Sequence, residues 1–400
     1  MGSWPLARAT AKRLISSVER FLSVEASSGI LLLAAAVLAL VWANSPWHAL
    51  YERILHAPIG LRIGRFAFER DVDFLVDDVL MVVFFFVVGL EIKRELYVGE
   101  LSTLRKAALP AFAALGGMLA PAGIYAVFNA GRPTASGWGI PMATDIAFAV
   151  GVLALLGKRV PPSLRILLLA LAVIDDLGSI VVIALFYSPG ISVGGLAVAA
   201  AGLFLIVALQ KMGVRSRWAY VVPAVVTWAG TYAGGVHPTI AGVVIGLLTP
   251  IQGEGESPVE GLQRSLHGWV AFVIMPVFAL ANAGVRFDGA RLSGDSASVL
   301  LGVALGLVVG KPIGVVGFSW LAVRAGVAAL PSGVRWSTIL VMGLVAGIGF
   351  TMALFIATLA LPPGAAIDIA KLGILLASVT AGAIGLGAGR LLLPARRDHP

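Results

Sequence analysis

The chain has 400 residues, a formal net charge of +8, 59% hydrophobic residues and only 12% charged residues. Soluble domains carry about 25% charged residues, so this composition excludes a soluble protein and indicates a membrane protein with many spans. The absence of cysteine excludes disulfides and thiolate chemistry. Nucleotide-binding, acyl-transfer and zinc-hydrolase motifs are also missing, so we expect neither an enzyme nor a cofactor. We attribute the positive charge to basic cytoplasmic loops and not to nucleic-acid binding.

Hydropathy predicts one all-α membrane domain over residues 1–400, with about twelve transmembrane helices in a core at residues 24–393. Residues 1–23 form a basic cytoplasmic tail, in which we expect an amphipathic helix on the membrane surface. The first span covers about residues 26–44. It ends in Val41-Trp42-Ala43, which resembles a signal-peptidase site, but cleavage there would spoil the charge asymmetry described below.

Residues 45–73 form a polar periplasmic connection with a short alternating pattern. Apolar residues alternate with small or charged ones on both sides of Gly64-Arg65, at Ile59, Leu61, Ile63, Phe66 and Phe68. This pattern predicts a small β-hairpin outside the membrane, with a two-residue turn. Because a lone hairpin is only marginally stable in water, we expect it to pair with a second copy in a homodimer.

The second span, at about residues 74–90, carries acidic residues at both ends. Asp78 lies near its start, and Glu91, Arg94 and Glu95 follow its end. Glu91 and Glu95 are one helical turn apart and lie on the same face of the helix. This pattern is typical of an ordinary solvated helix end, and it also suits a regulatory site.

Two later segments contain helix-breaking residues in the middle of an apolar stretch. Pro141 is followed by Thr144 and Asp145, which are good N-cap residues, so a new half-helix is expected there, although a simple proline kink is the alternative. Gly347 and Gly349 interrupt the segment at residues 339–361 in the same way. Breaks at corresponding positions of two halves predict inverted repeats, with two broken helices that cross.

Asp175 and Asp176 lie at the centre of an apolar segment at residues 166–186. Each charged carboxylate at that depth costs roughly 2.5–3.5 kcal/mol, so the pair must face a protein interior or a water-filled cavity. Lys311 lies inside the apolar span at about residues 299–323 and needs a partner for the same reason. The pair is therefore either a structural ion pair or part of an ion path.

Oxygen ligands are what a hard monovalent cation requires, and Asp175, Asp176 and Thr144 can supply them. Asp145 would offset the positive N-terminal ends of the broken helices, and Lys311 the negative C-terminal ends. If protons and the cation bind the same carboxylates, they compete, and the outcome is antiport. A sodium-coupled symporter of an organic anion on a similar crossed-helix fold is the alternative. An ion channel would need a continuous pore, which two broken helices do not suggest.

Five motifs together resemble the NhaA family of bacterial sodium/proton antiporters, over about residues 21–392. They are Ala143-Thr-Asp-Ile-Ala-Phe-Ala149, Ala172-Val-Ile-Asp-Asp-Leu-Gly178, Gly235-Val-His-Pro-Thr-Ile-Ala-Gly242, Gly310-Lys-Pro312 and Gly347-Ile-Gly-Phe-Thr351. The resemblance implies electrogenic exchange of Na⁺ or Li⁺ for protons, a twelve-span fold and a dimer in the bacterial inner membrane. It also implies that Asp176 is the main cation-binding carboxylate, that Asp175 pairs with Lys311, and that Asp145 and Lys311 are the charges at the crossing.

The resemblance further implies regulation by pH. Glu91, Arg94 and Glu95 match part of the sensing region of the family, and we group Asp78, His237 and His267 with them as accessory residues. His237 by itself is more typical of a packed, hydrogen-bonded histidine than of a metal ligand. The chain departs from the best-known pattern at Gln263 and Arg264, where an acid and a histidine are usual, so the pH set-point is not predicted.

The most charged loop of the chain is expected just before the span at about residues 269–285. Its charged residues are Glu254, Glu256, Glu260, Arg264 and His267.

The charge distribution predicts the orientation. Most of the 29 Lys and Arg residues fall in the tail, in the C-terminal end and in the loops on the same side of the membrane. Cytoplasmic loops carry this excess, so both termini are expected in the cytoplasm.

Overall fold

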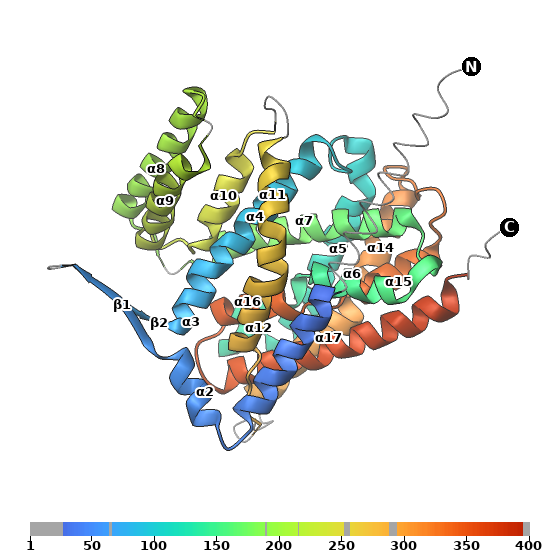
Figure 1. Cartoon of the computed structure of the whole chain (residues 1–400). Helices are drawn as coiled ribbons and strands as arrows, with labels where there is room; N and C mark the ends of the chain where they lie inside the picture. The colour runs from blue at the N-terminus through green and yellow to red at the C-terminus, as the bar shows by residue number, and fades with distance from the viewer. Residues whose placement is uncertain are drawn as a thin grey trace.

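The structure is a computed structural model (Figure 1), which describes residues 27–63, 66–188, 190–214, 216–251, 257–287 and 294–394. The predicted cytoplasmic tail and the predicted turn residues Gly64 and Arg65 lie outside these residues. The described residues are almost entirely helical, as predicted, with one two-stranded sheet.

The first half of the chain begins with the helix Ser27–Ala43. It continues with α2 (His48–Leu55), β1 (Pro58–Ile63), β2 (Phe66–Asp71), α3 (Val72–Phe74), η1 (Leu75–Leu80), α4 (Met81–Tyr97), α5 (Leu104–Asn129), η2 (Pro133–Met142), α6 (Ile146–Leu155), η3 (Gly157–Arg159) and α7 (Pro162–Phe186). The second half contains α8 (Val193–Lys211), η4 (Arg217–Tyr220), α9 (Val221–Ala233), α10 (Thr239–Leu248), α11 (Pro258–Trp269), η5 (Val270–Ile274), α12 (Met275–Asn282), α13 (Asp295–Leu305), η6 (Gly306–Gly310), α14 (Lys311–Arg324), α15 (Trp336–Ala346), α16 (Phe350–Ala360) and α17 (Ala365–Leu392).

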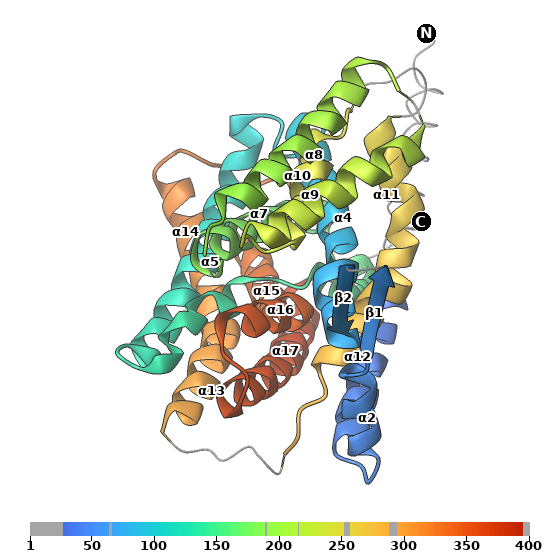
Figure 2. The ribbon, with the colours of Figure 1, turned by 90° about the vertical axis from the view of Figure 1, so that its left-hand side faces the viewer.

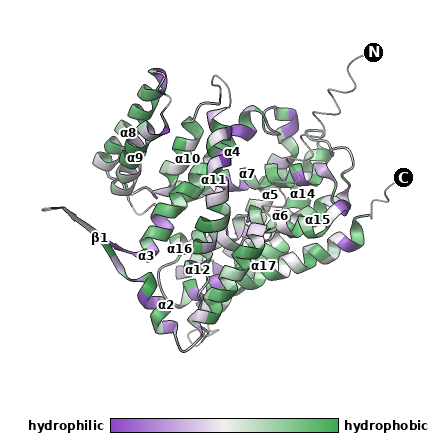
Figure 3. Cartoon of the chain, in the orientation of Figure 1, coloured by the Kyte–Doolittle hydropathy of each residue, from purple (hydrophilic) through white to green (hydrophobic). Residues whose placement is uncertain are grey.

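Six helices of the described part are long and apolar enough to cross a membrane, and the number rises to nine if each bent pair is one span. Hydrophobic residues cover most helices in Figure 3. Large apolar side chains also face outward, and Leu185 and Phe204 are each 72% exposed. Contiguous apolar surface of this kind is disfavoured in water but suits contact with lipid. The protein is therefore a multi-pass membrane protein.

Both predicted helix breaks are present. The pair η2 and α6 is bent by 45° across residues 143–145, and the pair α15 and α16 is bent by 49° across residues 347–349. Each break follows from its residues. Asp145 caps α6 by accepting a hydrogen bond from the amide of Phe148 at 3.0 Å. A Cβ atom on Gly347 would lie 2.5 Å from the carbonyl oxygen of Leu307, so only glycine fits the second break.

The predicted hairpin is also present, and its strands pair antiparallel from Pro58 opposite Asp71 to Ile63 opposite Phe66. In Figure 1 the hairpin projects away from the helices, on the same side of the molecule as α8 and α9. Figure 2 faces this side, on which α8 and α9 pack against each other. Asp71 ends β2 and caps the following helix by accepting a hydrogen bond from the amide of Phe74 at 3.0 Å.

One boundary differs from the prediction. The polar segment before residue 269 was predicted as a charged loop, but α11 begins at Pro258 and continues without interruption into η5 and α12. Pro258 occupies the first turn, where a missing amide hydrogen costs nothing. Gln263, Arg264 and His267 therefore lie on a helix. Glu254 and Glu256 of the same segment lie outside the described residues.

The position of Lys311 depends on close packing between α5 and α14. An added Cβ atom on Gly314 would lie 2.0 Å from the carbonyl oxygen of Gly116, and one on Gly116 would lie 2.2 Å from that of Gly314. The two backbones therefore touch, as small residues allow in membrane helices.

Gly314→Ala is expected to destabilise the protein by about 1–3 kcal/mol, since the new methyl group forces the two helices apart. Thermal unfolding in detergent, followed by tryptophan fluorescence, measures this effect. Gly317→Ala on the same helix is the matched control, because an added Cβ atom there meets nothing within 4 Å. Equal losses in the two variants would contradict the role of the contact.

Candidate functional site

The two broken helices meet at Asp145. Its amide donates a hydrogen bond to the carbonyl oxygen of Ile348 at 2.7 Å, which joins the two breaks directly. Its Oδ2 accepts hydrogen bonds from the amide of Thr351 at 3.1 Å and from the Thr351 hydroxyl at 2.5 Å. Since Oδ1 caps α6, one carboxylate serves the positive N-terminal ends of both α6 and α16.

Lys311 lies at the same crossing, next to the first break, and its side chain is fully buried. Its Nζ donates to the carbonyl oxygen of Met142, at the C-terminal end of η2, and to Oδ2 of Asp175 at 2.6 Å. The hydroxyl of Thr144 lies 2.8 Å from the same carboxylate oxygen. The ammonium group thus has both an ion-pair partner and the end of a helix dipole, which a buried cation requires.

Asp176 lies beside this pair and is only 1% exposed. The charged groups that act on it electrostatically are Asp175, Glu91, Asp145 and Lys311. Within the described part of the chain, Oδ1 of Asp176 and Oδ1 of Asp175 have no hydrogen-bond partner. Because an unsatisfied buried oxygen is costly, such an atom is suited to accept a water molecule, an ion or a proton. The oxygen atoms suit a hard cation carried as a substrate.

Asp78 and His237 lie together, apart from the crossing. His237 Nε2 lies 3.5 Å from Oδ1 of Asp78, and its Nδ1 lies 2.8 Å from the hydroxyl of Thr239. Trp228 donates to the backbone carbonyl of Asp78 at 2.9 Å, and the ring of Phe355 packs edge-on against His237. His237 is therefore a packed, hydrogen-bonded histidine.

Glu91, Arg94 and Glu95 lie near the end of α4, and the first two contact Gln263 on α11. The Gln263 amide donates to Glu91 at 3.1 Å and accepts from Arg94 at 3.2 Å, while Arg94 pairs with Glu95 at 3.3 Å. Gln263 is only 8% exposed, so the residue that departs from the family pattern is a central part of this cluster. His267 lies one turn further along α11.

A further charged cluster was missed in the sequence. Asn282 at the end of α12 donates to Oδ1 of Asp77 at 2.8 Å, and Lys371 on α17 lies 3.4 Å from Oδ1 of Asn282. The signal was present, because Lys371 falls within an apolar segment and Asp77 precedes Asp78. Their pairing could not be predicted, since the three residues come from distant helices.

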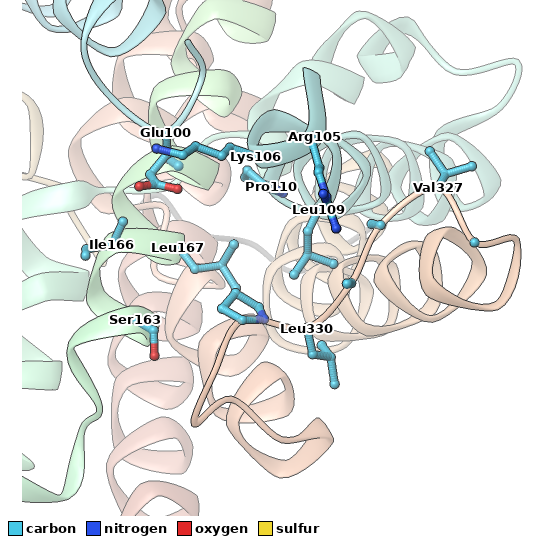
Figure 4. A pocket seen from close by; sticks show the side chains of 15 residues that line it. Glu100, Arg105, Lys106, Leu109, Pro110, Ser163, Ile166, Leu167, Val327 and Leu330 are labelled. Atoms are coloured by element: carbon cyan, nitrogen blue, oxygen red, sulfur yellow. The ribbon is translucent and has the colours of Figure 1, made fainter. Parts of the chain in front are cut away.

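A pocket of about 510 Å³ lies elsewhere, between α5, α7 and the loop after α14. Figure 4 shows Arg105 and Leu109 from α5, Leu167 from α7 and Leu330 from the loop around it. None of the candidate site residues in the described part of the chain lines this pocket. The cavity therefore does not open onto the acid pair.

Comparison with known proteins agrees with the geometry. A family model described as Na⁺/H⁺ antiporter 1 matches residues 19–388. The Na⁺/H⁺ antiporter NhaA 2 of Myxococcus xanthus is 54% identical, over 94% of this chain and 89% of that protein. NhaA 2 of Sorangium cellulosum is 49% identical, over 98% of this chain and 93% of that protein. NhaA of Bordetella petrii is 46% identical, over 97% of this chain and 93% of that protein. The chain belongs to the NhaA family of Na⁺/H⁺ antiporters.

Proposed function

We propose that this protein is an electrogenic antiporter that exchanges Na⁺ or Li⁺ for protons by alternating access. The observation that carries the proposal is the acid pair at the helix crossing, where each aspartate keeps one buried oxygen without a partner in the described residues. The names of the relatives support the choice of ions, since each is called an Na⁺/H⁺ antiporter.

Competition at these oxygens explains the exchange. Asp176 binds either a proton or the cation, because a carboxylate that is protonated is a poor ligand for a cation. A cation that also contacts Asp175 must weaken the 2.6 Å contact between Asp175 and Lys311. An unpaired buried ammonium is costly, so Lys311 then releases a proton. Two protons leave for each sodium ion, and the cycle moves net charge.

The membrane arrangement that we propose has twelve spans in two inverted repeats, with both termini in the cytoplasm of the bacterial cell. The paired breaks at residues 143–145 and 347–349 support the repeats. The excess of basic residues on the tail side supports the orientation, and the bacterial relatives support the inner membrane.

For pH regulation we propose the cluster of Glu91, Arg94, Glu95 and His267 at the cytoplasmic end, with Gln263 linking α4 to α11. Asp78 and His237 are proposed as an accessory pair near the periplasmic end of α4. The symport alternative lacks a supporting observation, since the 510 Å³ pocket lies away from the acid pair.

The direct test uses the purified protein in vesicles with an imposed pH gradient, reported by a fluorescent dye, and adds Na⁺, Li⁺ and K⁺ in turn. Na⁺ and Li⁺ are expected to dissipate the gradient, and K⁺ is not. A gradient that none of the three ions disturbs would refute the proposal. A requirement for an organic anion in addition to Na⁺ would favour symport.

We also propose that the hairpin joins two copies of the protein. Deleting residues 58–70 is expected to shift the protein from dimer to monomer and to leave exchange largely intact, because β1 and β2 lie far along the chain from the crossing and project away from the helices. Sedimentation in detergent measures the change. A dimer that survives the deletion would place the interface on another surface.

A further inference from the structure

We propose that Ser179 supplies a further oxygen ligand to the transported cation and thereby sets the affinity for Na⁺ relative to Li⁺. This role rests on the proposed function, and it adds a residue that the sequence patterns did not indicate. Ser179 is 1% exposed, and its Oγ has no hydrogen-bond partner in the described part of the chain.

The position of Ser179 on α7 places it beside both aspartates. Residues on a helix are about 100° apart around its axis, so Asp176 points about 100° from Asp175. Ser179 then points about 40° from Asp175, between the two acids, and lies one turn further along the helix. Residues three and four positions apart are neighbours on the helix surface. Ser179 is thus adjacent to Asp175 and Asp176 at the same time.

The hydroxyl of Ser179 also lacks a local hydrogen bond that several other hydroxyls on the described helices make. A serine or threonine in a membrane helix usually bonds back to the carbonyl three or four residues earlier. In the described helices six do so at distances of 2.7–2.9 Å, namely Thr227, Thr231, Ser265, Ser298, Thr358 and Thr380. Ser179 has no such bond to the carbonyl of Asp175.

Among the described residues, three buried oxygens without partners therefore lie within about one turn of one helix: Oδ1 of Asp175, Oδ1 of Asp176 and Oγ of Ser179. Lys311 uses only the other oxygen of Asp175. Carboxylate and hydroxyl oxygens are hard ligands, which suit an alkali cation. These three oxygens lie on one face of α7. An ion bound at Asp176 therefore has the Ser179 hydroxyl within reach, directly or through one retained water.

The effect on selectivity follows from ligand number. A smaller ion is satisfied by fewer oxygen ligands, as the comparison of Mg²⁺ with Ca²⁺ illustrates. Removing one neutral oxygen should therefore weaken Na⁺ binding more than Li⁺ binding. Losing one polar contact to a charged group is expected to raise the KM for Na⁺ about tenfold.

The test compares Ser179→Ala with wild type in sodium-driven and lithium-driven proton flux, and measures Na⁺ binding to the purified protein by calorimetry. Ser179→Ala is expected to raise the KM and the Kd for Na⁺ about tenfold and those for Li⁺ by less. Ser179→Thr keeps the hydroxyl and should keep the Na⁺ affinity. Ser179→Cys keeps the size of the side chain but offers a soft sulfur, so its Na⁺ affinity should fall as in the alanine variant. It replaces Ser179→Ala in the test if the alanine variant does not fold.

Ser319→Ala is the matched control. Its hydroxyl is likewise fully buried and without a partner in the described residues, but it lies on α14, two turns from Lys311. We expect it to leave the KM for Na⁺ unchanged. If wild type exchanges Na⁺ for protons and Ser179→Ala keeps its KM for Na⁺ within twofold, the role of Ser179 is refuted and the proposed function stands. If wild type shows no sodium-driven flux, both are refuted.

Discussion

Asp176→Asn is expected to abolish sodium-driven proton flux, with a loss of activity to the background of empty vesicles. The amide keeps the shape of the side chain in its buried position, where the carboxylate is 1% exposed, so the protein should still fold and insert. An amide neither binds a proton nor carries the charge that attracts the cation. Exchange by dye quenching in vesicles measures the effect, and size-exclusion chromatography checks the fold.

Asp295→Asn is the control for this variant. Asp295 forms an exposed ion pair with Arg132 at 2.7 Å, and such pairs contribute little. We expect wild-type exchange from it. Exchange near the wild-type rate in Asp176→Asn would instead remove Asp176 from the site and make Asp175 the remaining candidate for the essential carboxylate.

Lys311→Gln is expected to remove the voltage dependence of sodium/proton exchange, which is the second largest effect we predict. If Lys311 carries the second proton, the variant exchanges one proton for each sodium ion and moves no net charge. Each net charge that crosses the membrane gains roughly 2.3 kcal/mol per 100 mV, so wild type should respond to a potential and the variant should not. The measurement is exchange in proteoliposomes with and without a potential set by valinomycin. A variant as voltage-dependent as wild type would place the second proton elsewhere.

Stability complicates this variant, and a second substitution addresses it. Removing one partner of a buried ion pair costs about 3–5 kcal/mol, because the other charge is left unpaired. Lys311→Gln should therefore melt at a lower temperature than wild type. Adding Asp175→Asn removes both charges and should restore much of the loss. A double variant that melts as low as Lys311→Gln would mean that the contact at 2.6 Å does not stabilise the fold.

The helix breaks could be predicted because the residues that mark them are visible in the sequence. Pro141 and the N-cap Asp145 act on their own backbone, and the glycines at 347 and 349 indicate the second break, although the contact of Gly347 with Leu307 is a tertiary one. The hairpin followed from a period of two, which requires no tertiary contact. The start of α11 was mispredicted, because the polar residues after Pro258 resemble a loop until the partner α4, with Glu91 and Arg94, is placed beside them.

The chemistry of the site could be predicted only in part. A carboxylate pair in an apolar span is recognisable from the sequence alone, so Asp175 and Asp176 could be predicted as a candidate ion site. Which oxygen is satisfied and which is left without a partner depends on helices that are distant in sequence. For that reason Ser179, the bridging role of Gln263, and the cluster of Asp77, Asn282 and Lys371 were not predicted.

The most direct test of competition at the acid pair is the KM for Na⁺ measured at a series of pH values in vesicles that contain wild-type protein. If protons and Na⁺ bind the same carboxylates, the KM falls as the pH rises, by about tenfold per pH unit for each competing proton until the site is deprotonated. The maximal rate at saturating Na⁺ should change much less. A KM that stays constant while only the maximal rate changes with pH would show that protons act at a separate site, and it would contradict the mechanism.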